Sequence, residues 1–299
     1  MAAPAYELEP EPDLETESVG ARIVRFLGRT PVHMALVVIA ILWMVPTFGL
    51  GVTSFRPRGD ILSTGWWDVV KHPSFTLHNY DVVLRSAGMG RAFLNSLFIT
   101  IPSTLIPLTI GALAAFAFAW VRFPLRDTLF LSMVALMVVP IQMSLVPLLK
   151  LFRTMGVTDS YVGIWLAHTA FGLPLAIFLL RNFFIALPRD LIEAARIDGA
   201  SNLAVFRRIV VPLSVPAIAS YGIFQFLWVW NDLLMALIFV QNPNQRPMTL
   251  KINDLLSTYG QEWHLLSSGA FLLMIVPLIV FFSLQRYFVQ GLLAGSVKS

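Results

Sequence analysis

Long runs of apolar residues, separated by short polar segments, extend along most of the chain. A transmembrane helix needs about 20 such residues to cross roughly 30 Å of hydrocarbon. Six runs meet this requirement: Val32–Val52, Phe93–Trp120, Thr128–Leu149, Val162–Leu180, Ala217–Val240 and Gly269–Leu284. The pattern therefore predicts an all-α polytopic membrane protein with six transmembrane helices.

The composition excludes several other classes of protein. Hydrophobic residues make up 57% of the chain and charged residues 13%, whereas soluble domains average about 45–50% and about 25%. The sequence has no Cys, which excludes a disulfide-stapled fold and thiolate chemistry. The net charge of +4 is too small to indicate a nucleic-acid partner.

The two ends of the spans differ in charge, and this predicts the orientation of the chain. Acidic residues dominate the opening segment, so we expect residues 1–30 to be a disordered cytoplasmic tail. A secretory signal begins with basic residues, and the first apolar run is therefore expected to remain as an anchor. Arg29, Arg122 and Arg181 lie at span ends that face the cytoplasm if both termini are cytoplasmic. The positive-inside rule favours that orientation.

A polar insertion between the fourth and fifth spans predicts two short helices with a break between them. In the first helix, Pro188 suits the first helical position, and Leu191, Ala194 and Ala195 share one face. Gly199 can adopt a positive φ and end this helix. Such a hairpin presents small and apolar side chains to something outside the membrane.

The second short helix of the insertion begins near Ser201 or Asn202, either of which can cap it. An apolar face follows, and Pro212 is expected to stop the helix. The residues that share this face are Leu203, Phe206, Ile209 and Val210.

The insertion resembles the "EAA" loop of binding-protein-dependent ABC importer permeases. The resemblance rests on Glu193-Ala194-Ala195, Asp198-Gly199-Ala200, Phe206, Ile209 and Pro212, at the expected place before the last two spans. It extends from about Arg91 to the end and includes Trp230-Asn231-Asp232 and the stretch from Gln285 to Gly291. The usual Leu-Pro that closes the loop is Val211-Pro212 here.

The resemblance implies the type I ABC importer permease fold, most similar to the second permease of carbohydrate importers of the maltose/α-glucoside type. It divides the chain into the tail (1–30), a first helix with its outer loop (31–90), a permease domain (91–290) and a C-terminal tail (291–299). The residues that it implies for ATPase coupling are Glu193, Ala194, Ala195, Asp198, Gly199, Ala200, Phe206 and Pro212.

The partners and substrate also follow from the resemblance. It implies a second permease subunit in a heterodimer, an ATPase dimer that binds ATP and Mg, and an extracytoplasmic sugar-binding protein, all at a bacterial or archaeal cell membrane. The expected substrate is a sugar or oligosaccharide such as an α-glucoside of the maltose or trehalose type. Glycerol phosphate or another polyol is the alternative substrate, and an ATP-independent channel is the alternative class.

The chain itself lacks the chemistry of an ATPase or another enzyme. None of its four Lys follows a Gly, so the Gly-Lys-Ser/Thr sequence of a P-loop is absent. The five His are scattered and predict no metal site. His168 lies inside the fourth span and is expected to hydrogen-bond a neighbouring helix.

Two spans carry polar residues that can line a substrate pathway. Tyr221, Gln225, Trp228 and Asp232 share one helical face, with Asn231 beside it. In the third span, Gln142 belongs to a broken polar stretch with Pro140, Ser144 and Pro147. Bonds between neighbouring helices and a packed kink explain the same residues equally well, and both interpretations stay open.

The loop before the final span has a second possible role outside the membrane. In the permeases that the chain resembles, this loop reaches into the docked binding protein. The expected contact residues here are Thr258, Tyr259, Gly260 and Gln261. A plain solvated turn is the alternative, because the same residue types are common in turns.

Overall fold

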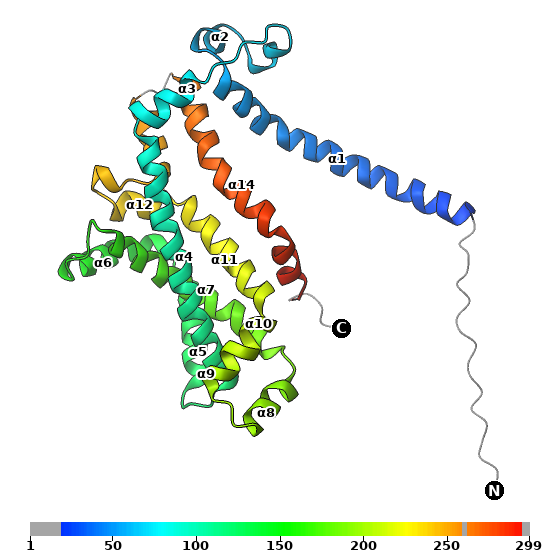
Figure 1. The fold of residues 1–299 in the computed structure, drawn as a ribbon, viewed down its shortest axis with the longest axis vertical. Coiled ribbons are helices and arrows are strands. Elements are labelled where there is room, and N and C mark those ends of the chain that lie inside the picture. Colours follow the sequence, from blue (N-terminus) through cyan, green and yellow to red (C-terminus); the bar gives the residue numbers. More distant parts are fainter. Residues whose placement is uncertain (1–18, 259–261, 295–299) are drawn as a thin grey trace. The chain divides into compact units, whose positions relative to one another are not determined.

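The computed structural model describes residues 19–258 and 262–294 and divides into two compact units, residues 1–50 and residues 51–299. The first unit contains most of α1 (Val19–Phe55), drawn in blue in Figure 1. Side chains from residue 31 to 48 are exposed and overwhelmingly apolar, as expected of a helix surrounded by lipid. The expected tail lies outside the described residues up to residue 18, whereas residues 19–30 are helical rather than disordered.

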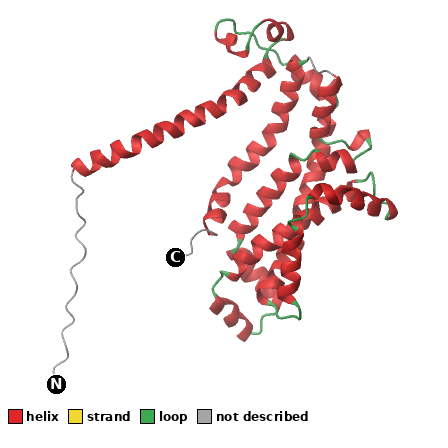
Figure 2. Cartoon of the chain, turned by 180° about the vertical axis from the view of Figure 1, so that it is seen from behind, coloured by secondary structure: helices red, strands yellow, loops and turns green. Residues whose placement is uncertain are grey.

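The second unit is a bundle of helices, and Figure 2 shows no strand among the described residues. Short helical segments connect α1 to the bundle: α2 (Arg58–Ser63), η1 (Trp66–Val70), α3 (His78–Asp81) and η2 (Val82–Ser86). The first half of the bundle comprises α4 (Met89–Trp120), α5 (Arg126–Leu136), α6 (Ile141–Thr154) and α7 (Tyr161–Ile185). Between α7 and the next long helix lie α8 (Arg189–Ile197), α9 (Asn202–Val205), η3 (Phe206–Val210) and α10 (Val211–Leu213). The last segments are α11 (Val215–Trp230), α12 (Leu234–Phe239), η4 (Pro243–Gln245), α13 (Met248–Thr258) and α14 (Trp263–Ala294).

Four helices of the described chain are long and apolar enough to cross a membrane, and six spans result if each of two bent helix pairs counts as one. The four are Thr30–Phe55, Met89–Trp120, Tyr161–Ile185 and Trp263–Arg286. They contain the predicted first, second, fourth and sixth spans. The all-α fold and the six-span arrangement therefore agree with the prediction, whereas the third and fifth spans differ in detail.

The predicted third span is bent rather than straight. Helices α5 and α6 meet at 103°, and the break lies between Leu136 and Ile141. Pro140 explains the break, because the residue before a proline is pushed out of the helical conformation. Pro140 itself is extended, with φ −60° and ψ 130°. The polar stretch that the sequence marked as broken begins at this break, but Gln142, Ser144 and Pro147 lie within the continuous helix α6.

The predicted fifth span, Ala217–Val240, is wrong as one helix. Helix α11 ends at Trp230, and α12 is a separate short helix after a break at residues 231–233. At its other end, α11 meets the segment Asn202–Leu213 at an angle of 78°. The extra length of this pair comes from the insertion and not from α12.

Helices α4 and α7 form the tightest contact in the bundle, and α11 packs against α4, α7 and α14. Small residues allow this close approach. A side chain added at Gly111 of α4 would place its Cβ 2.6 Å from the Cβ of Ala176 on α7. The three-helix contact of α4, α7 and α11 therefore forms the frame that positions the regions described next.

Candidate functional site

The insertion folds into the two short helices that its sequence predicts, at the end of the bundle where α5 also lies (Figure 1). Helix α8 starts one residue after Pro188, which occupies the N-cap rather than the first helical position. Gly199 adopts φ +82° directly after α8, and Ala200 donates its backbone N–H to the carbonyl of Ala195 at 2.9 Å. The Ser201 side chain accepts a hydrogen bond from the Ala204 backbone N–H and caps α9. The break at Gly199 and the cap at Ser201 are as predicted.

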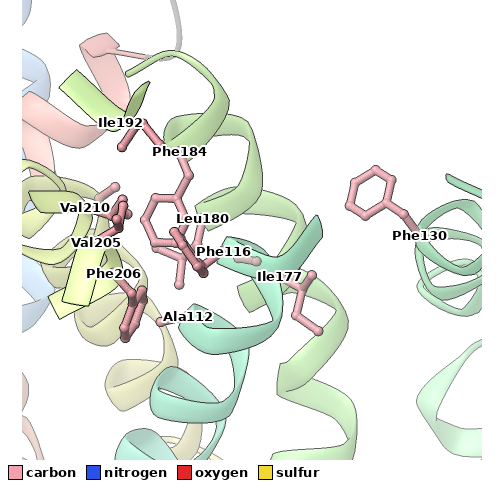
Figure 3. Packing of buried hydrophobic residues seen from close by; sticks show 12 residues of the cluster. Ala112, Phe116, Phe130, Ile177, Leu180, Phe184, Ile192, Val205, Phe206 and Val210 are labelled. Carbon is pink, nitrogen blue, oxygen red and sulfur yellow. The ribbon is translucent and has the colours of Figure 1, made fainter. Parts of the chain in front are cut away.

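Helix α8 is anchored to the bundle by one buried side chain. Ile192 is 1% exposed and belongs to the same buried cluster as Phe184 of α7, Val205 and Phe206 (Figure 3). Ala195 packs against this cluster on the same side of α8. The Ile192 side chain therefore fixes α8 to the end of α7.

A second anchor joins α8 to α4. Arg196 donates from Nη2 to the carbonyl of Trp120, the last residue of α4, at 2.8 Å. Trp120 in turn donates from Nε1 to the carbonyl of Phe184 on α7 at 3.1 Å. Helix α8 is therefore hydrogen-bonded to α4 and packed on α7. A displacement of α8 would act on both of these helices, which share the most extensive contact in the bundle.

The outward face of α8 differs from the predicted one. Leu191 and Ala194 are exposed, whereas Ala195 turns toward the bundle, so the three residues do not share a buried face. The outer face carries Leu191, Glu193, Ala194 and Ile197, and Ile197 is 86% exposed. Ile192, which was not among the residues predicted to share the apolar face, is the buried residue. The outer face of α8 therefore exposes two large apolar side chains, Leu191 and Ile197, beside small and acidic ones.

The second short helix also departs from its prediction at two points. Phe206 and Val210 are buried, and Ile209 packs partly against them, but Leu203 is 57% exposed. Pro212 does not stop the helix, because η3 continues into α10 and the chain bends only at Ser214. Pro212 lies near the end of this continuous helical segment, two residues before the bend at Ser214.

The other coupling residues of the resemblance are divided between surface and core. Glu193, Asp198 and Gly199 are exposed, and so is Pro212. Ala195 and Ala200 pack against the buried cluster around Phe206. The exposed members can contact another chain, and the buried members hold the two short helices in place.

A crevice of about 600 Å³ lies where α6, α7 and α11 meet. It combines the two segments that the sequence singled out, since Ser144 and Pro147 of α6 line it together with Gln225 and Trp228 of α11. The remaining lining is almost entirely apolar and includes Met137, Phe171, Gly172 and Phe224. A volume in this range, with few polar groups on apolar walls, suits a small-molecule ligand.

The polar groups of two predicted pathway residues are hydrogen-bonded within the bundle. Tyr221 and Gln225 are fully buried. The Tyr221 hydroxyl lies 3.0 Å from the carbonyl of Gly172, to which it donates, and 3.2 Å from Oε1 of Gln225. The Gln225 amide donates from Nε2 to the carbonyl of Ser103 at 3.2 Å. These bonds link α11 to α7 and α4, as the alternative interpretation of the two residues requires.

Asp232 lies within the break between α11 and α12, and its carboxylate caps the start of α12. Its carboxylate accepts hydrogen bonds from the backbone N–H groups of Met235 at 3.4 Å and Ala236 at 3.1 Å. Asn231 is exposed and donates from its side chain back to the carbonyl of Leu227 at 2.8 Å. The two residues are therefore placed at a chain break and not on the face of one continuous helix with Trp228.

His168 lies against the same break but makes no hydrogen bond with the described residues, contrary to the expected bond to a neighbouring helix. It is 1% exposed, and its ring meets Trp228 edge-on at 5.5 Å between centroids. Its Nε2 lies 3.9 Å from Oδ2 of Asp232. The described residues contain no group of three or more His, Cys, Asp or Glu that could hold a metal ion.

The remaining residues predicted for the substrate pathway or the binding-protein contact either do not line the crevice or lie at or outside the limits of the described residues. Gln142 is exposed on α6 and does not line the crevice. Thr258 is the last residue of α13, and Tyr259, Gly260 and Gln261 lie outside the described residues. The predicted contact with a binding protein therefore remains a prediction.

Several residues of the two regions had no sequence signal. In the sequence, Arg196 looks like an ordinary basic residue near a helix end, and Gly172 looks like an ordinary small residue within a span. Neither pattern indicates the contacts that these residues make. The signal for Ile192 was present, because Ile192 and Ala195 are three residues apart on one face. Tertiary contacts alone distinguish that face from the one through Leu191.

The described chain is thus a helical membrane bundle with an anchored pair of short helices at one end and a ligand-sized crevice where α6, α7 and α11 meet. The sequence pattern of the family described as "Binding-protein-dependent transport system inner membrane component" matches residues 107–293. The chain belongs to this family of multi-pass inner-membrane transport components.

Two relatives resemble the chain over most of its length. It is 55% identical over 283 residues to the "Osmoprotective compounds uptake permease protein GgtD" of Synechocystis sp., with 93% of this chain and 95% of that protein covered. It is 54% identical over 232 residues to the "Alpha-glucoside transport system permease protein AglG" of Rhizobium meliloti, with 76% and 61% covered. Both relatives are named as uptake or transport permeases.

Solved structures show the same fold. A chain from the crystal structure of a bacterial ABC transporter involved in the import of the acidic polysaccharide alginate superposes with a TM-score of 0.64 at 14% identity, covering 93% of this chain and 100% of that one. A second structure, of the alginate transporter in complex with an alginate pentasaccharide-bound periplasmic protein, gives 0.62 at 16% identity, covering 89% and 96%. The type I ABC importer permease fold is therefore that of this chain.

Proposed function

We propose that the chain is the permease subunit of an ATP-driven importer that moves a sugar or oligosaccharide of the α-glucoside type. The observation that carries this proposal is the 54% identity to an α-glucoside permease together with the anchored α8 helix. An ATP-independent channel would need no such docking helix, and this favours the importer. A separate ATPase dimer binds ATP and Mg, because this chain has no P-loop.

The α8 region is the proposed docking surface for that ATPase. Its exposed Ile197 and Glu193 enter the ATPase surface, while Ile192 and Arg196 hold α8 on α7 and α4. ATP binding and hydrolysis move α8, and the motion passes to α4 and α7. The family residues Ala195, Gly199 and Ala200 support this role by shaping the turn between the two short helices.

The crevice between α6, α7 and α11 is the proposed wall of the substrate pathway. Its open side is completed by a second, homologous permease in a heterodimer. Trp228 offers an aromatic face to a pyranose ring, and Ser144 offers a hydroxyl, while Tyr221 and Gln225 support the wall from behind. Both chain termini and the α8 end lie in the cytoplasm in this proposal, as the distribution of Arg favours.

An extracytoplasmic binding protein delivers the sugar at the opposite end. The proposed contact segment begins with Thr258, the last residue of α13, and continues with Tyr259, Gly260 and Gln261. The alginate transporter structure with its periplasmic protein supports the presence of such a partner. Shortening this loop should slow sugar release without weakening docking.

Transport by the assembled complex tests the proposal. The chain, its partner permease, the ATPase and the binding protein are reconstituted in liposomes, and uptake of labelled maltose and trehalose is measured with and without ATP. ATP-dependent uptake that requires the binding protein supports the importer. Uptake without ATP would show a channel, and uptake of glycerol phosphate in preference to either sugar would show the polyol alternative.

A second substrate class is favoured by the 55% identity to GgtD, whose name refers to osmoprotective compounds. The same reconstituted system separates the two classes by competition. Excess unlabelled glycine betaine should leave maltose uptake unchanged if the pathway is built for α-glucosides. Inhibition by glycine betaine but not by unlabelled maltose would assign the permease to osmoprotectants.

A further inference from the structure

A pocket of about 440 Å³ opens at the start of α4. Figure 1 shows that this end of α4 lies away from α8. The pocket lies between the start of α4 and the segment that runs through η4 into α13. Four basic residues line it, namely Arg85, Arg91, Arg246 and Lys251, and no acidic residue does. It shares no lining residue with the crevice. The pocket is therefore a separate cationic feature.

The walls of this pocket are held by hydrogen bonds. Arg91 donates from Nη1 to Oδ1 of Asn244 at 2.8 Å. Asn95 donates from Nδ2 to the carbonyls of Asn244 at 2.8 Å and Arg246 at 3.1 Å, and Tyr161 donates its hydroxyl to Oδ1 of Asn95 at 2.9 Å. These bonds join α4, α7 and the η4 segment, so the basic side chains are presented from a fixed frame.

Acidic neighbours compensate only two of the four basic residues. Arg85 pairs with Asp81 at 2.8 Å, and Arg246 pairs with both oxygens of Asp254 at 2.9 and 2.8 Å. Among the described residues, Arg91 and Lys251 have no acidic partner. The pocket therefore keeps an excess of positive charge, which an uncharged sugar does not neutralise and a carboxylate does.

We propose that this pocket receives an acidic side chain on the surface of the extracytoplasmic binding protein. The proposal rests on the proposed function, which places this end of the bundle outside the cell. The lining is mainly polar, whereas a lipid headgroup site also needs an apolar flank for the acyl chains. A macromolecular partner that approaches from water fits a pocket with these walls better than a lipid.

The position of Lys251 connects this contact to sugar release. Lys251 lies in the first turns of α13, an 11-residue helix that ends at Thr258, directly before the loop proposed to contact the binding protein. At 1.5 Å per residue, such a helix spans about 16 Å. A carboxylate held by Lys251 and Arg91 would fix one end of α13 against the docked protein and aim its other end at the sugar-binding cleft.

The experiment measures docking of the purified binding protein to the complete transporter in nanodiscs at 50 and 500 mM NaCl. Lys251→Glu should lower the affinity about tenfold at low salt, and the deficit should shrink at high salt because screening weakens exposed charge contacts. Lys71→Glu is the matched control, since Lys71 is an exposed lysine of the segment between α1 and α4 that does not line the pocket. It should dock like the unaltered transporter.

A charge exchange identifies the partner group. Acidic residues on the binding protein are changed to Lys one at a time, and one of them should restore docking of Lys251→Glu while weakening docking of the unaltered transporter. Lys251→Met tests the charge without repulsion and should give a smaller loss. Retention of normal solubilisation and elution of each variant confirms that it is folded.

Three outcomes overturn the proposal. They are equal losses for Lys251→Glu and Lys71→Glu, unchanged affinity and salt dependence for Lys251→Glu, and altered retention of an anionic phospholipid in native mass spectrometry without any change in docking. The proposed function fails separately, if the unaltered transporter takes up sugar without its binding protein. Absence of docking by the unaltered transporter at both salt concentrations would likewise contradict the proposed function and not the pocket alone.

Discussion

The α8 region and the crevice place polar residues in opposite ways. At α8, Glu193 and Asp198 are exposed and available to a partner, and the apolar Ile192 provides the anchor. In α11, beside the crevice, Tyr221 and Gln225 are fully buried and bonded to neighbouring helices. Water satisfies polar groups at the end of a bundle, whereas inside a membrane span the protein must satisfy them itself. An exposed polar residue on α8 is therefore stronger support for a contact with another molecule than a buried, hydrogen-bonded polar residue in α11.

Gly199→Pro should produce the largest effect and would break the α8 half of this comparison. Proline fixes φ near −65°, which is incompatible with the +82° at this position. Sugar uptake should fall to background while the protein still inserts, because no span changes. Gly156→Pro is the control, since Gly156 also has a positive φ, +70°, but lies after α6. Normal substrate-stimulated ATPase activity of Gly199→Pro would contradict the docking role.

Ile192→Ala and Ile197→Ala form a matched pair that separates anchor from contact. The buried Ile192 should cost about 2–5 kcal/mol in stability when truncated, whereas the exposed Ile197 should change stability by less than about 0.5 kcal/mol. Both should lower ATPase stimulation in the reconstituted complex. Thermal unfolding in detergent measures the first difference. Equal destabilisation of the two variants would show that α8 lies differently.

Ser144→Leu tests the crevice. Leucine removes the hydroxyl and adds apolar volume to the lining of the crevice, which leaves less space for a sugar. The KM for the transported sugar should rise about tenfold, with ATPase docking unchanged. Met143→Leu is the control on the exposed side of α6. An unchanged KM in Ser144→Leu would remove the crevice from the proposed pathway.

Tyr221→Phe should give the smallest effect and sharpens the crevice half of the comparison. The change removes the hydroxyl that contacts Gly172 and Gln225, and bonds of this kind between membrane helices average about 0.6 kcal/mol and reach about 1.7. Thermal stability should fall slightly, and the KM should stay constant. A raised KM with unchanged stability would assign the hydroxyl to the sugar instead.

The bends and breaks of the chain were largely predictable from local residues. Gly199 supplies the positive φ, Ser201 supplies the cap, and Pro140 precedes the turn between α5 and α6. Each of these acts through its own backbone or through near neighbours, so the sequence alone carries the information. Pro212 was misread, because the helical segment that begins at Asn202 continues through it and bends only at Ser214.

The division of α11 from α12 was not predictable from hydropathy. The run Ala217–Val240 is predominantly apolar, and Asp232 is its one ionisable acidic or basic side chain, so such a run predicts one helix. Asp232 breaks it because its carboxylate accepts bonds from the N–H groups of Met235 and Ala236. Whether an aspartate faces a pathway or caps a helix depends on the backbone around it.

The sequence by itself predicted an all-α membrane protein with two short helices between its fourth and fifth spans, since span length and local turn residues are short-range properties. Tertiary structure decided which faces matter. The orientation of α8 about its own axis buries Ile192 and exposes Ile197. Because α4 and α7 pack against α11, the polar groups of Tyr221 and Gln225 are hydrogen-bonded to those helices. Residues far apart in sequence create those environments, and a periodic pattern along one helix does not specify the neighbour that each face meets.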